Sequence, residues 1–422
     1  MSRESLLSHR DFRRLWTGDA ISQLGSSVTM VAMPLLAVTM LRATPLQVGL
    51  LTTFEFLAFP VLGLPAGALV DRMRRRRVMI AADLGRAATL GSVPVAAVLG
   101  VLTLWQLFVV VFVTGCLTVF FDVSYQSYLP FLVGRDHLVD GNAKLQGTQS
   151  VAQVAGPSVG GLLVQLVTAP FALATDAVSY LCSALWLSTI RRAEPTPEPH
   201  ANAHLLTQIR EGVTFVFRHP LLRPIAACTA TSNLWTSAAQ SMLIVLLARE
   251  LRLSAGVIGA LMSAGACGGV LGAFLARRLA ARLGQGPAIW LSVAASAPLT
   301  LVQPFLHRDW TLGLFVATQL IVFAGVVVYN ITQVSFRQAL CPERLLGRMN
   351  ATMRFFVWGT LPLGGLLGGV LGTLLGVRAA LLLAGIGSSL AFLWIYFSPL
   401  RWLRELPNAP ESTSTSASAT PS

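Results

Sequence analysis

The sequence predicts an all-α membrane protein with twelve transmembrane helices. Hydrophobic residues make up 54% of the 422 residues, charged residues make up only 12%, and the mean hydropathy is +0.67. A soluble domain carries roughly 25% charged residues, so this composition excludes a soluble protein. Twelve apolar stretches are long enough to cross a bilayer as helices, and they lie at about 15–41, 46–66, 78–100, 104–132, 142–168, 171–190, 222–248, 254–276, 286–306, 310–338, 348–375 and 377–398.

The basic residues orient these predicted helices. Of the 31 Lys and Arg residues, one lies just inside a helix (Arg86), and five lie on one side of the membrane (Arg42, Arg249, Arg252, Arg308 and Arg378). The others lie on the side that holds both termini. Because Lys and Arg accumulate in cytoplasmic loops, we expect a multi-pass plasma-membrane protein with both termini in the cytoplasm. The same placement accounts for the net charge of +13 without a nucleic-acid partner.

The order of the segments predicts two halves joined by a linker. We expect an N-terminal six-helix bundle at 1–190, a cytoplasmic linker at 191–221, a C-terminal six-helix bundle at 222–404 and a disordered tail at 405–422. The linker begins with the proline-rich piece RRAEPTPEPH. It continues into a predicted amphipathic helix on the inner membrane surface, whose apolar positions are Leu205, Leu206, Ile209, Val213 and Val216.

An internal repeat supports this division. The sequence GALVDR, which begins at Gly67, recurs as GAFLAR at Gly272, and Pro157 recurs as Pro362 at the same offset. Six plus six helices related in this way predict two pseudo-symmetric bundles around a cavity at the middle of the membrane.

The stretch GALVDRMRRRR, from Gly67 to Arg77, connects the second and third apolar segments. It resembles the signature loop between helices 2 and 3 of the major facilitator superfamily, G-x-L-a-D-r-x-G-r-r-r. Arg74 stands where that pattern has its second glycine. The resemblance implies a transporter whose two bundles rock about a central site. In such a protein Gly67 lets two helices approach closely, and Gly67, Asp71 and Arg72 act as a conformational latch.

Helix 5 carries a second pattern that resembles proton-coupled exporters of this superfamily. Gly156, Pro157, Gly160 and Gly161 fit its small-residue and proline positions. The alternative is that they only allow tight helix packing. The stretches HRDFRRLWTGDAISQLGSS, EGVTFVFRHPLLR and ERLLGRMNATMRFF further resemble the branch that exports drugs, macrolides and siderophores.

Five carboxylates lie within the predicted membrane segments, all in the first half, where they are costly and usually functional. We expect Asp83 to pair with Arg86 near the inner surface, and Asp176 to be a hydrogen-bonded packing residue. The remaining three, Glu55, Asp122 and Asp19, are candidates for proton coupling or for binding a cationic substrate. The alternative is that they are protonated hydrogen-bond donors between helices.

Polar side chains also form stripes on helices 1, 4, 7 and 10, which line the cavity in the superfamily. The candidates are Gln23, Tyr125, Gln126, Asn233, Trp235, Gln240, Tyr329, Asn330 and Gln333. Many drug antiporters carry an arginine in helix 4, whereas this chain has none between Val109 and Phe121. In the second half the only basic residues at depth are Arg337 and Arg354. One interpretation is that each caps its helix at the inner surface, and we favour it for Arg337; for Arg354 the role stays open.

These features predict proton-driven efflux of a small amphipathic compound by alternating access. The expected partners are the small-molecule substrate, protons and the lipid bilayer, and we expect a monomer. The sequence has no nucleotide-binding loop, catalytic nucleophile, metal site or cofactor motif, which argues against an enzyme and against direct use of ATP. Two alternatives remain: an importer or facilitator of a nutrient, and a non-transporting receptor on the same scaffold.

Overall fold

The computed structural model describes residues 6, 9–70, 72–134, 137–192, 194 and 205–404. The predicted disordered tail at 405–422, most of the linker before residue 205, and the latch residue Asp71 lie outside these described residues.

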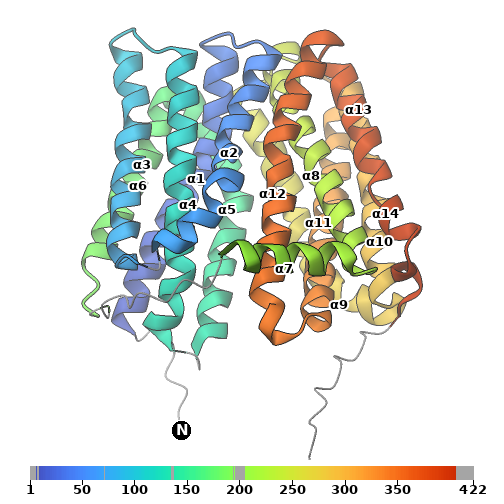
Figure 1. The fold of residues 1–422 in the computed structure, drawn as a ribbon. Helices are drawn as coiled ribbons and strands as arrows, with labels where there is room; N and C mark the ends of the chain where they lie inside the picture. The colour runs from blue at the N-terminus through green and yellow to red at the C-terminus, as the bar shows by residue number, and fades with distance from the viewer. Residues whose placement is uncertain are drawn as a thin grey trace, which may run out of the picture.

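The helices of the two halves stand side by side (Figure 1), as the sequence predicted. The first half contains α1 (Arg10–Thr39), α2 (Pro45–Val70), α3 (Arg75–Val98), α4 (Leu104–Val133), α5 (Leu138–Val167) and α6 (Ala169–Ser188). The second contains α8 (Leu222–Val245) with the π-helical η3 (Leu246–Glu250), α9 (Ala255–Leu283), α10 (Gln285–Ser296) with η4 (Ala297–Phe305), α11 (Thr311–Leu340), α12 (Glu343–Leu374), α13 (Val377–Leu390), α14 (Leu393–Tyr396) and η5 (Pro399–Trp402). We call these halves the N-bundle and the C-bundle.

Each of the twelve apolar segments corresponds to a helix. Within the described residues, 11 helices are long and apolar enough to cross a membrane. The remaining one, α8, is 24 residues long and more polar. Several helices begin earlier than the apolar stretches that predicted them, as α12 does at Glu343. The reason is that a helix continues into polar residues beyond the hydrocarbon layer, where hydropathy no longer marks it.

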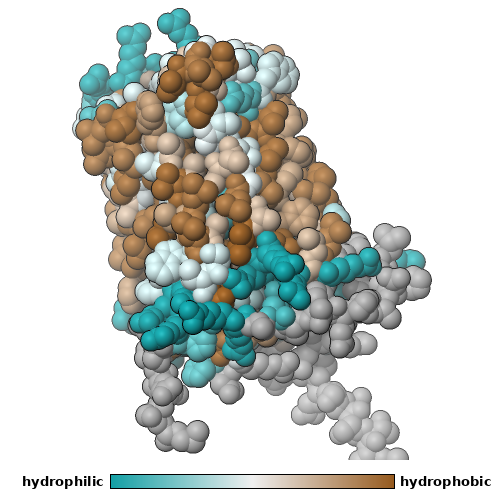
Figure 2. All heavy atoms as spheres, turned by 90° about the vertical axis from the view of Figure 1, so that its left-hand side faces the viewer, coloured by the Kyte–Doolittle hydropathy of each residue, from teal (hydrophilic) through white to brown (hydrophobic). Residues whose placement is uncertain are grey.

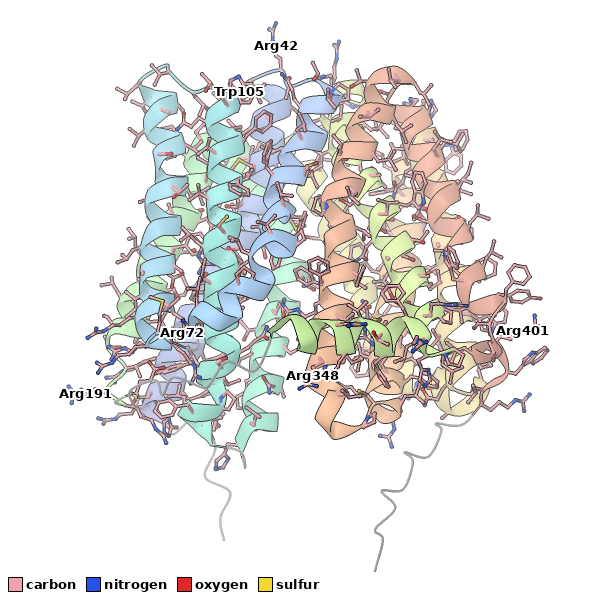
Figure 3. The ribbon with its side chains drawn as sticks, in the orientation of Figure 1. Arg42, Arg72, Trp105, Arg191, Arg348 and Arg401 are labelled. Atoms are coloured by element: carbon pink, nitrogen blue, oxygen red, sulfur yellow. The ribbon has the colours of Figure 1, made fainter. Side chains whose placement is uncertain are left out.

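The two ends of the molecule differ in charge. Arg72, Arg191, Arg348 and Arg401 lie at the end where α1 begins and η5 ends, and Arg42 lies at the other end (Figure 3). We call these ends the terminal face and the opposite face. Hydrophobic side chains cover the middle of the surface in Figure 2, and hydrophilic ones gather at the terminal face. This is the pattern expected of a protein that spans a bilayer.

The linker helix α7 (Leu205–Arg218) lies across the terminal end of the C-bundle (Figure 1). Val216 is fully buried, and a Cβ on Gly212 would lie 2.8 Å from the carbonyl oxygen of Arg348 on α12. Glu211 forms an ion pair with Arg348. The amphipathic helix is therefore present as predicted, but it packs against α12. The side chains of Leu205, Leu206 and Ile209 lie outside the described residues.

The basic loop between α2 and α3 is shorter than its sequence suggested, because three of its arginines belong to the first turn of α3. Arg74 precedes the helix with φ −69°, a conformation open to any residue, which explains why no glycine is needed there.

Positive side chains at a helix N-terminus oppose the helix dipole, and here a carboxylate compensates. Glu194, from the linker, accepts hydrogen bonds from the backbone N–H groups of Arg75 (2.9 Å) and Arg76 (3.2 Å). The Arg76 side chain donates to the carbonyl oxygens of Leu187 (2.9 Å) and Ser188 at the end of α6. The loop is thus fastened to its own bundle.

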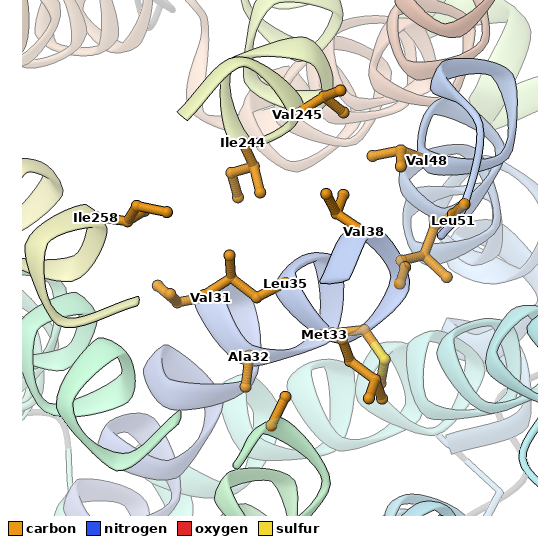
Figure 4. Packing of buried hydrophobic residues seen from close by; sticks show 14 of the residues in the cluster. Val31, Ala32, Met33, Leu35, Val38, Val48, Leu51, Ile244, Val245 and Ile258 are labelled. Carbon is orange, nitrogen blue, oxygen red and sulfur yellow. The ribbon is translucent and has the colours of Figure 1, made fainter. Parts of the chain in front are cut away.

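Buried apolar residues join the two bundles near the opposite face (Figure 4). One cluster combines Val31, Leu35 and Val38 of α1 with residues of the C-bundle, among them Ile244 and Ile258. The clusters nearer the terminal face each belong to a single bundle. Among the described residues, the bundles therefore share a hydrophobic core in the half of the molecule at the opposite face.

Small residues let α5 and α9 touch backbone to backbone within this shared region. A methyl group on Gly161 would overlap the carbonyl oxygen of Ala255 and would lie 3.0 Å from the Cα of Gly259. Pro157 lies inside α5 at this level, and the neighbouring Ser158 N–H donates to Ser263 Oγ of α9 (2.8 Å). The other two motif glycines, Gly156 and Gly160, pack on α1.

The same arrangement recurs between α2 and α12, as the repeat predicted. A Cβ on Gly365 would lie 2.9 Å from the carbonyl oxygen of Gly49. The Thr53 hydroxyl donates to the carbonyl oxygen of Pro362 (3.0 Å). Pro157 and Pro362, which are equivalent in the repeat, therefore both lie at contacts between the bundles.

The prediction for Gly67 is wrong in this conformation. Gly67 and Gly63 have nothing within 4 Å of an added Cβ, so neither serves a close helix approach. Pro60 lies 3.8 Å from a Cβ added at Gly359 of α12, and Gly63, one turn further along α2, lines a cavity between the bundles. Arg72 is exposed.

We predict that a larger side chain in the α5–α9 contact separates the bundles at the opposite face. Gly161→Val should destabilise the arrangement in which α5 contacts α9 by about 1–3 kcal/mol, because the valine side chain would overlap α9. In a cysteine-free background, spin labels at Val101→Cys and Arg308→Cys, in opposite-face loops of the two bundles, should report a longer distance.

The matched control is Gly147→Val, which changes a glycine of the same helix that has nothing within 4 Å. It should leave the distance unchanged. A folded Gly161→Val variant with the wild-type distance distribution would show that this contact does not hold the bundles together.

Candidate functional site

A cavity of about 130 Å³ lies between the bundles in the half toward the terminal face. Its walls come from α2, α4 and α12, and they consist of Phe59, Gly63, Val119, Asp122, Val123, Ala351, Arg354, Phe355 and Trp358. Apart from one carboxylate and one guanidinium, all of these side chains are apolar or aromatic. The cavity is smaller than a typical site for a drug-sized ligand, so it can hold one part of such a molecule.

Two of the predicted α4 residues contribute to this region. Asp122 lines the cavity. Gln126, four residues later on the same helix face, accepts a hydrogen bond from the Arg354 guanidinium of α12 (3.2 Å). This bond joins the bundles on the terminal side of the shared core. Tyr125 instead stacks on Phe121 within the N-bundle, with ring centroids 5.9 Å apart.

Glu55 lies on the face of α2 that meets the cavity. It precedes Phe59 by four residues and Gly63 by eight, and these two residues line the cavity, so all three share one side of the helix. Glu55 is exposed, and its backbone packs against Gly115 of α4. It therefore lies about two turns deeper than Gly63, toward the opposite face.

Asp19 lies deeper in the N-bundle. It is buried, with 7% of its surface exposed, and Gln23 lies one turn along on the same face of α1. Tyr125 is close to both Asp19 and Asp122. These neighbours place Asp19 behind the cavity wall, on the N-bundle side of Asp122.

Arg86 forms the centre of the buried polar groups in the N-bundle. Its guanidinium pairs with Asp83 and lies 4.4 Å from the ring centroid of Phe121 and 4.3 Å from that of Tyr180. The Asp83–Arg86 pair was predicted, but it lies near the middle of α3 and is fully buried, not near the inner surface. The charge of Arg86 also acts on Asp19 and Asp122.

Asp176 is completely buried and accepts hydrogen bonds from the hydroxyl groups of Thr29 and Ser179. The packing role expected for it agrees with this geometry.

The three α8 candidates, Asn233, Trp235 and Gln240, lie in different surroundings. Asn233 donates to the carbonyl oxygen of Val357 on α12 (3.1 Å), and Gln240 is exposed. The ring of Trp235 packs directly over Gly387 of α13. Trp235 therefore lies inside the C-bundle. The prediction that it lines the cavity is wrong in this structure.

The α11 candidates also separate. Tyr329 is buried in the C-bundle core, and its hydroxyl hydrogen-bonds with that of Thr229 (2.6 Å). It was predicted to line the cavity, and in this structure it does not. Asn330 is exposed, and Gln333 is buried. Arg337 lies in the last turn of α11, as a helix-end role requires.

Comparisons with known proteins agree with this architecture. The profile of a family described as transmembrane secretion effectors, within the major facilitator superfamily, matches residues 2–418. The chain belongs to this family. It is thus a multi-pass membrane transporter, and its fold and relatives are those of transporters, not of enzymes.

Several characterised relatives are exporters. The enterobactin exporter EntS of Escherichia coli is 27% identical over 350 residues, which cover 82% of this chain and 81% of EntS. The multidrug efflux pump Tap of Mycolicibacterium fortuitum is 26% identical over 395 residues, covering 90% of this chain and 93% of Tap.

Other relatives match over a shorter length. The transporter YfiS of Bacillus subtilis is 27% identical over 250 residues, or 59% of YfiS. Macrolide efflux protein A of Streptococcus pyogenes is 26% identical over 44% of its length. The chain thus matches less than two thirds of the length of these two relatives.

Solved structures share the fold. The nucleoside transporter NupG has a TM-score of 0.74 at 13% identity, covering 92% of this chain and 99% of NupG. A bacterial homologue of the iron transporter ferroportin, in an inward-facing state, has a TM-score of 0.69 at 19% identity, covering 93% of this chain and 100% of that one. At these identities the likeness concerns the fold alone.

Sequence reasoning missed the importance of Arg86 and Arg354. The signal for Arg86 was an Asp-x-x-Arg pair inside an apolar segment, where an arginine is costly unless buried in protein. The signal for Arg354 was its spacing from Trp358. Four residues apart, the two share a helix face, and the guanidinium carbon lies 5.6 Å from the indole centroid.

We predict that Arg86 is required for the stability of the N-bundle. Arg86→Met leaves the buried Asp83 carboxylate without its cation, and breaking such a pair costs about 3–5 kcal/mol. Thermal unfolding in detergent should therefore show a large loss of stability.

Replacing both partners, with Asp83→Leu and Arg86→Met, should restore most of that stability because no unpaired charge is left. Arg278→Met, which removes an exposed arginine of α9, is the control. If the double variant were no more stable than the single one, the ion pair would not be the source of the effect.

Proposed function

We propose that this transporter exports a small amphipathic compound, such as a drug, an antibiotic or a siderophore, in exchange for protons. The observation that carries the proposal is a carboxylate, Asp122, in a cavity that is otherwise mostly apolar and aromatic and lies between the two bundles. Such a lining suits a flat or bulky apolar solute better than a sugar or an inorganic ion. The relatives EntS and Tap, which are named as exporters, support the direction.

In this proposal, Glu55, Asp122 and Asp19 carry the coupling protons. A carboxyl group held away from bulk water can keep a proton near neutral pH, and can release it when the charges around it change. The groups that face Asp122 are Arg86, Tyr125 and Asp19 from the N-bundle and Arg354 from the C-bundle. Rocking of the bundles would change the distance to Arg354 alone, because the other groups move with Asp122.

Alternating access would use the two inter-bundle contacts as its hinge. The bundles share a core at the opposite face, and the cavity lies toward the terminal face. We assign the structure to the form that receives substrate from the terminal face, and we assign that face to the cytoplasm of the cell, with both termini there. The cavity lies within a single chain, so a monomer is sufficient.

We predict that neutralising either the cavity carboxylate Asp122 or the deeper Glu55 uncouples transport. In a strain without its own exporters, Asp122→Asn and Glu55→Gln should each reduce uncoupler-sensitive efflux by about tenfold, the effect of losing roughly 1.4 kcal/mol of interaction. A panel of drugs and siderophores, tested with and without an uncoupler, provides the measurement.

Asp309→Asn, which neutralises an exposed carboxylate in an opposite-face loop, is the matched control and should retain full efflux. Wild-type activity in both cavity variants would remove Glu55 and Asp122 from the mechanism. Net uptake of the same compounds into vesicles of known orientation would instead indicate an importer, and expression without any flux would indicate a receptor.

A further inference from the structure

The two walls of the cavity carry opposite charges. The N-bundle wall provides Asp122 from α4, and the C-bundle wall provides Arg354 from α12. From α8 to α13, the helical segments contain only two carboxylates in the sequence, Glu250 at the end of η3 and Glu343 at the start of α12, and neither is among the described residues that line the cavity. The acidic and basic sides of the site therefore belong to different bundles.

Arg354 is held close to Asp122 by a neutral partner. Its Nη1 donates to Gln126 Oε1 (3.2 Å), and Gln126 lies one helical turn from Asp122. Side chains four residues apart on a helix have Cβ atoms about 5–6 Å apart. A small molecule can therefore contact both the carboxylate and the guanidinium at once.

The guanidinium keeps capacity for a stronger partner. Its five N–H donors form a planar fork that matches a carboxylate, and bonds to an ionised acceptor are about twice as strong as bonds to a neutral one. Within the described part of the chain, Arg354 forms no ion pair with a carboxylate, and its side chain is exposed. A ligand carrying an acidic group could displace the Gln126 amide.

Aromatic rings flank the two charges. The rings of Phe59 on α2 and Trp358 on α12 lie with centroids 4.7 Å apart, and Phe355 lines the same cavity. A flat aromatic body could pack on these rings while its polar groups reach the charged pair.

We propose that the substrates are aromatic zwitterions, whose cationic group binds Asp122 and whose acidic group binds Arg354. This inference rests on the proposed export function and names its substrate class. A cationic group would compete with a proton for Asp122, which gives exchange a physical basis. The acidic group would bind the other bundle, so only a molecule with both charges bridges the two moving halves.

The test uses a fluoroquinolone, norfloxacin, as the zwitterionic probe. Its methyl ester keeps only the cation, and its N-acetyl derivative keeps only the acid. Binding to the purified full-length protein is followed by fluorescence polarisation. Wild-type protein should bind norfloxacin about tenfold more tightly than either derivative, the difference expected for one charge-assisted bond.

The variants should remove one preference each. Arg354→Gln should lower the affinity for norfloxacin to that for the ester, and it should leave the affinity for the ester unchanged. Asp122→Asn should weaken norfloxacin to the affinity of the N-acetyl derivative. Arg278→Gln, a surface arginine of the same bundle, should change nothing. If Arg354→Gln does not purify as a single species, Arg354→Lys should show the same loss of preference to a smaller extent, since an ammonium cannot form the planar fork.

Equal affinity of the wild type for all three probes, or binding of none, would overturn the proposal. So would an Arg354→Gln variant that weakens ester and zwitterion equally. Export is measured separately, as uncoupler-sensitive efflux from wild-type cells. If the ester and the zwitterion are exported equally well, the export function holds and only the proposed substrate class is rejected.

Discussion

Direct contact between helix backbones, without intervening side chains, determines how the two bundles meet. At Gly161 and Gly259, and again at Gly49 and Gly365, the absence of a Cβ allows carbonyl oxygens to approach the neighbouring helix. Close packing of this kind tolerates little change in distance, but it leaves the bundles free to tilt about the contact. Both contacts lie beside a proline inside a helix, Pro157 of α5 and Pro362 of α12. The cavity exists because the helices diverge on the terminal side of these points.

The buried charges of the N-bundle lie next to the cavity carboxylate Asp122, on the side away from the cavity. Arg86 is held by Asp83 and by the rings of Phe121 and Tyr180. A charge fixed in this way sets a constant field at Asp122, whereas the field of Arg354 depends on the position of the other bundle. In the proposed exchange mechanism, the proton affinity of Asp122 would follow the relative position of the bundles, as coupling between two states requires.

The sequence predicted the helices and their pairing more reliably than it predicted the direction of single side chains. Hydropathy identified every membrane segment, because spanning length is a property of the chain alone. The Asp83–Arg86 pair followed from a spacing of three residues on one helix. The surroundings of Trp235 and Tyr329 did not follow, because helical periodicity groups residues on a face without saying which helix that face meets. Gly67 has no close neighbour in this conformation, and its role in a latch stays a prediction, because a sequence pattern does not specify the conformation in which a contact forms.

The anchoring of the linker at both ends has a mechanical consequence. Glu194 ties one end to α3 of the N-bundle, and α7 is fixed to α12 by the Glu211–Arg348 pair and the contact at Gly212. Only residues 195–204 of the sequence separate these two attachments. At no more than about 3.6 Å per residue this stretch reaches roughly 40 Å. This length limits how far the N-bundle and the C-bundle can separate. Because α7 is attached to α12, it moves with the C-bundle.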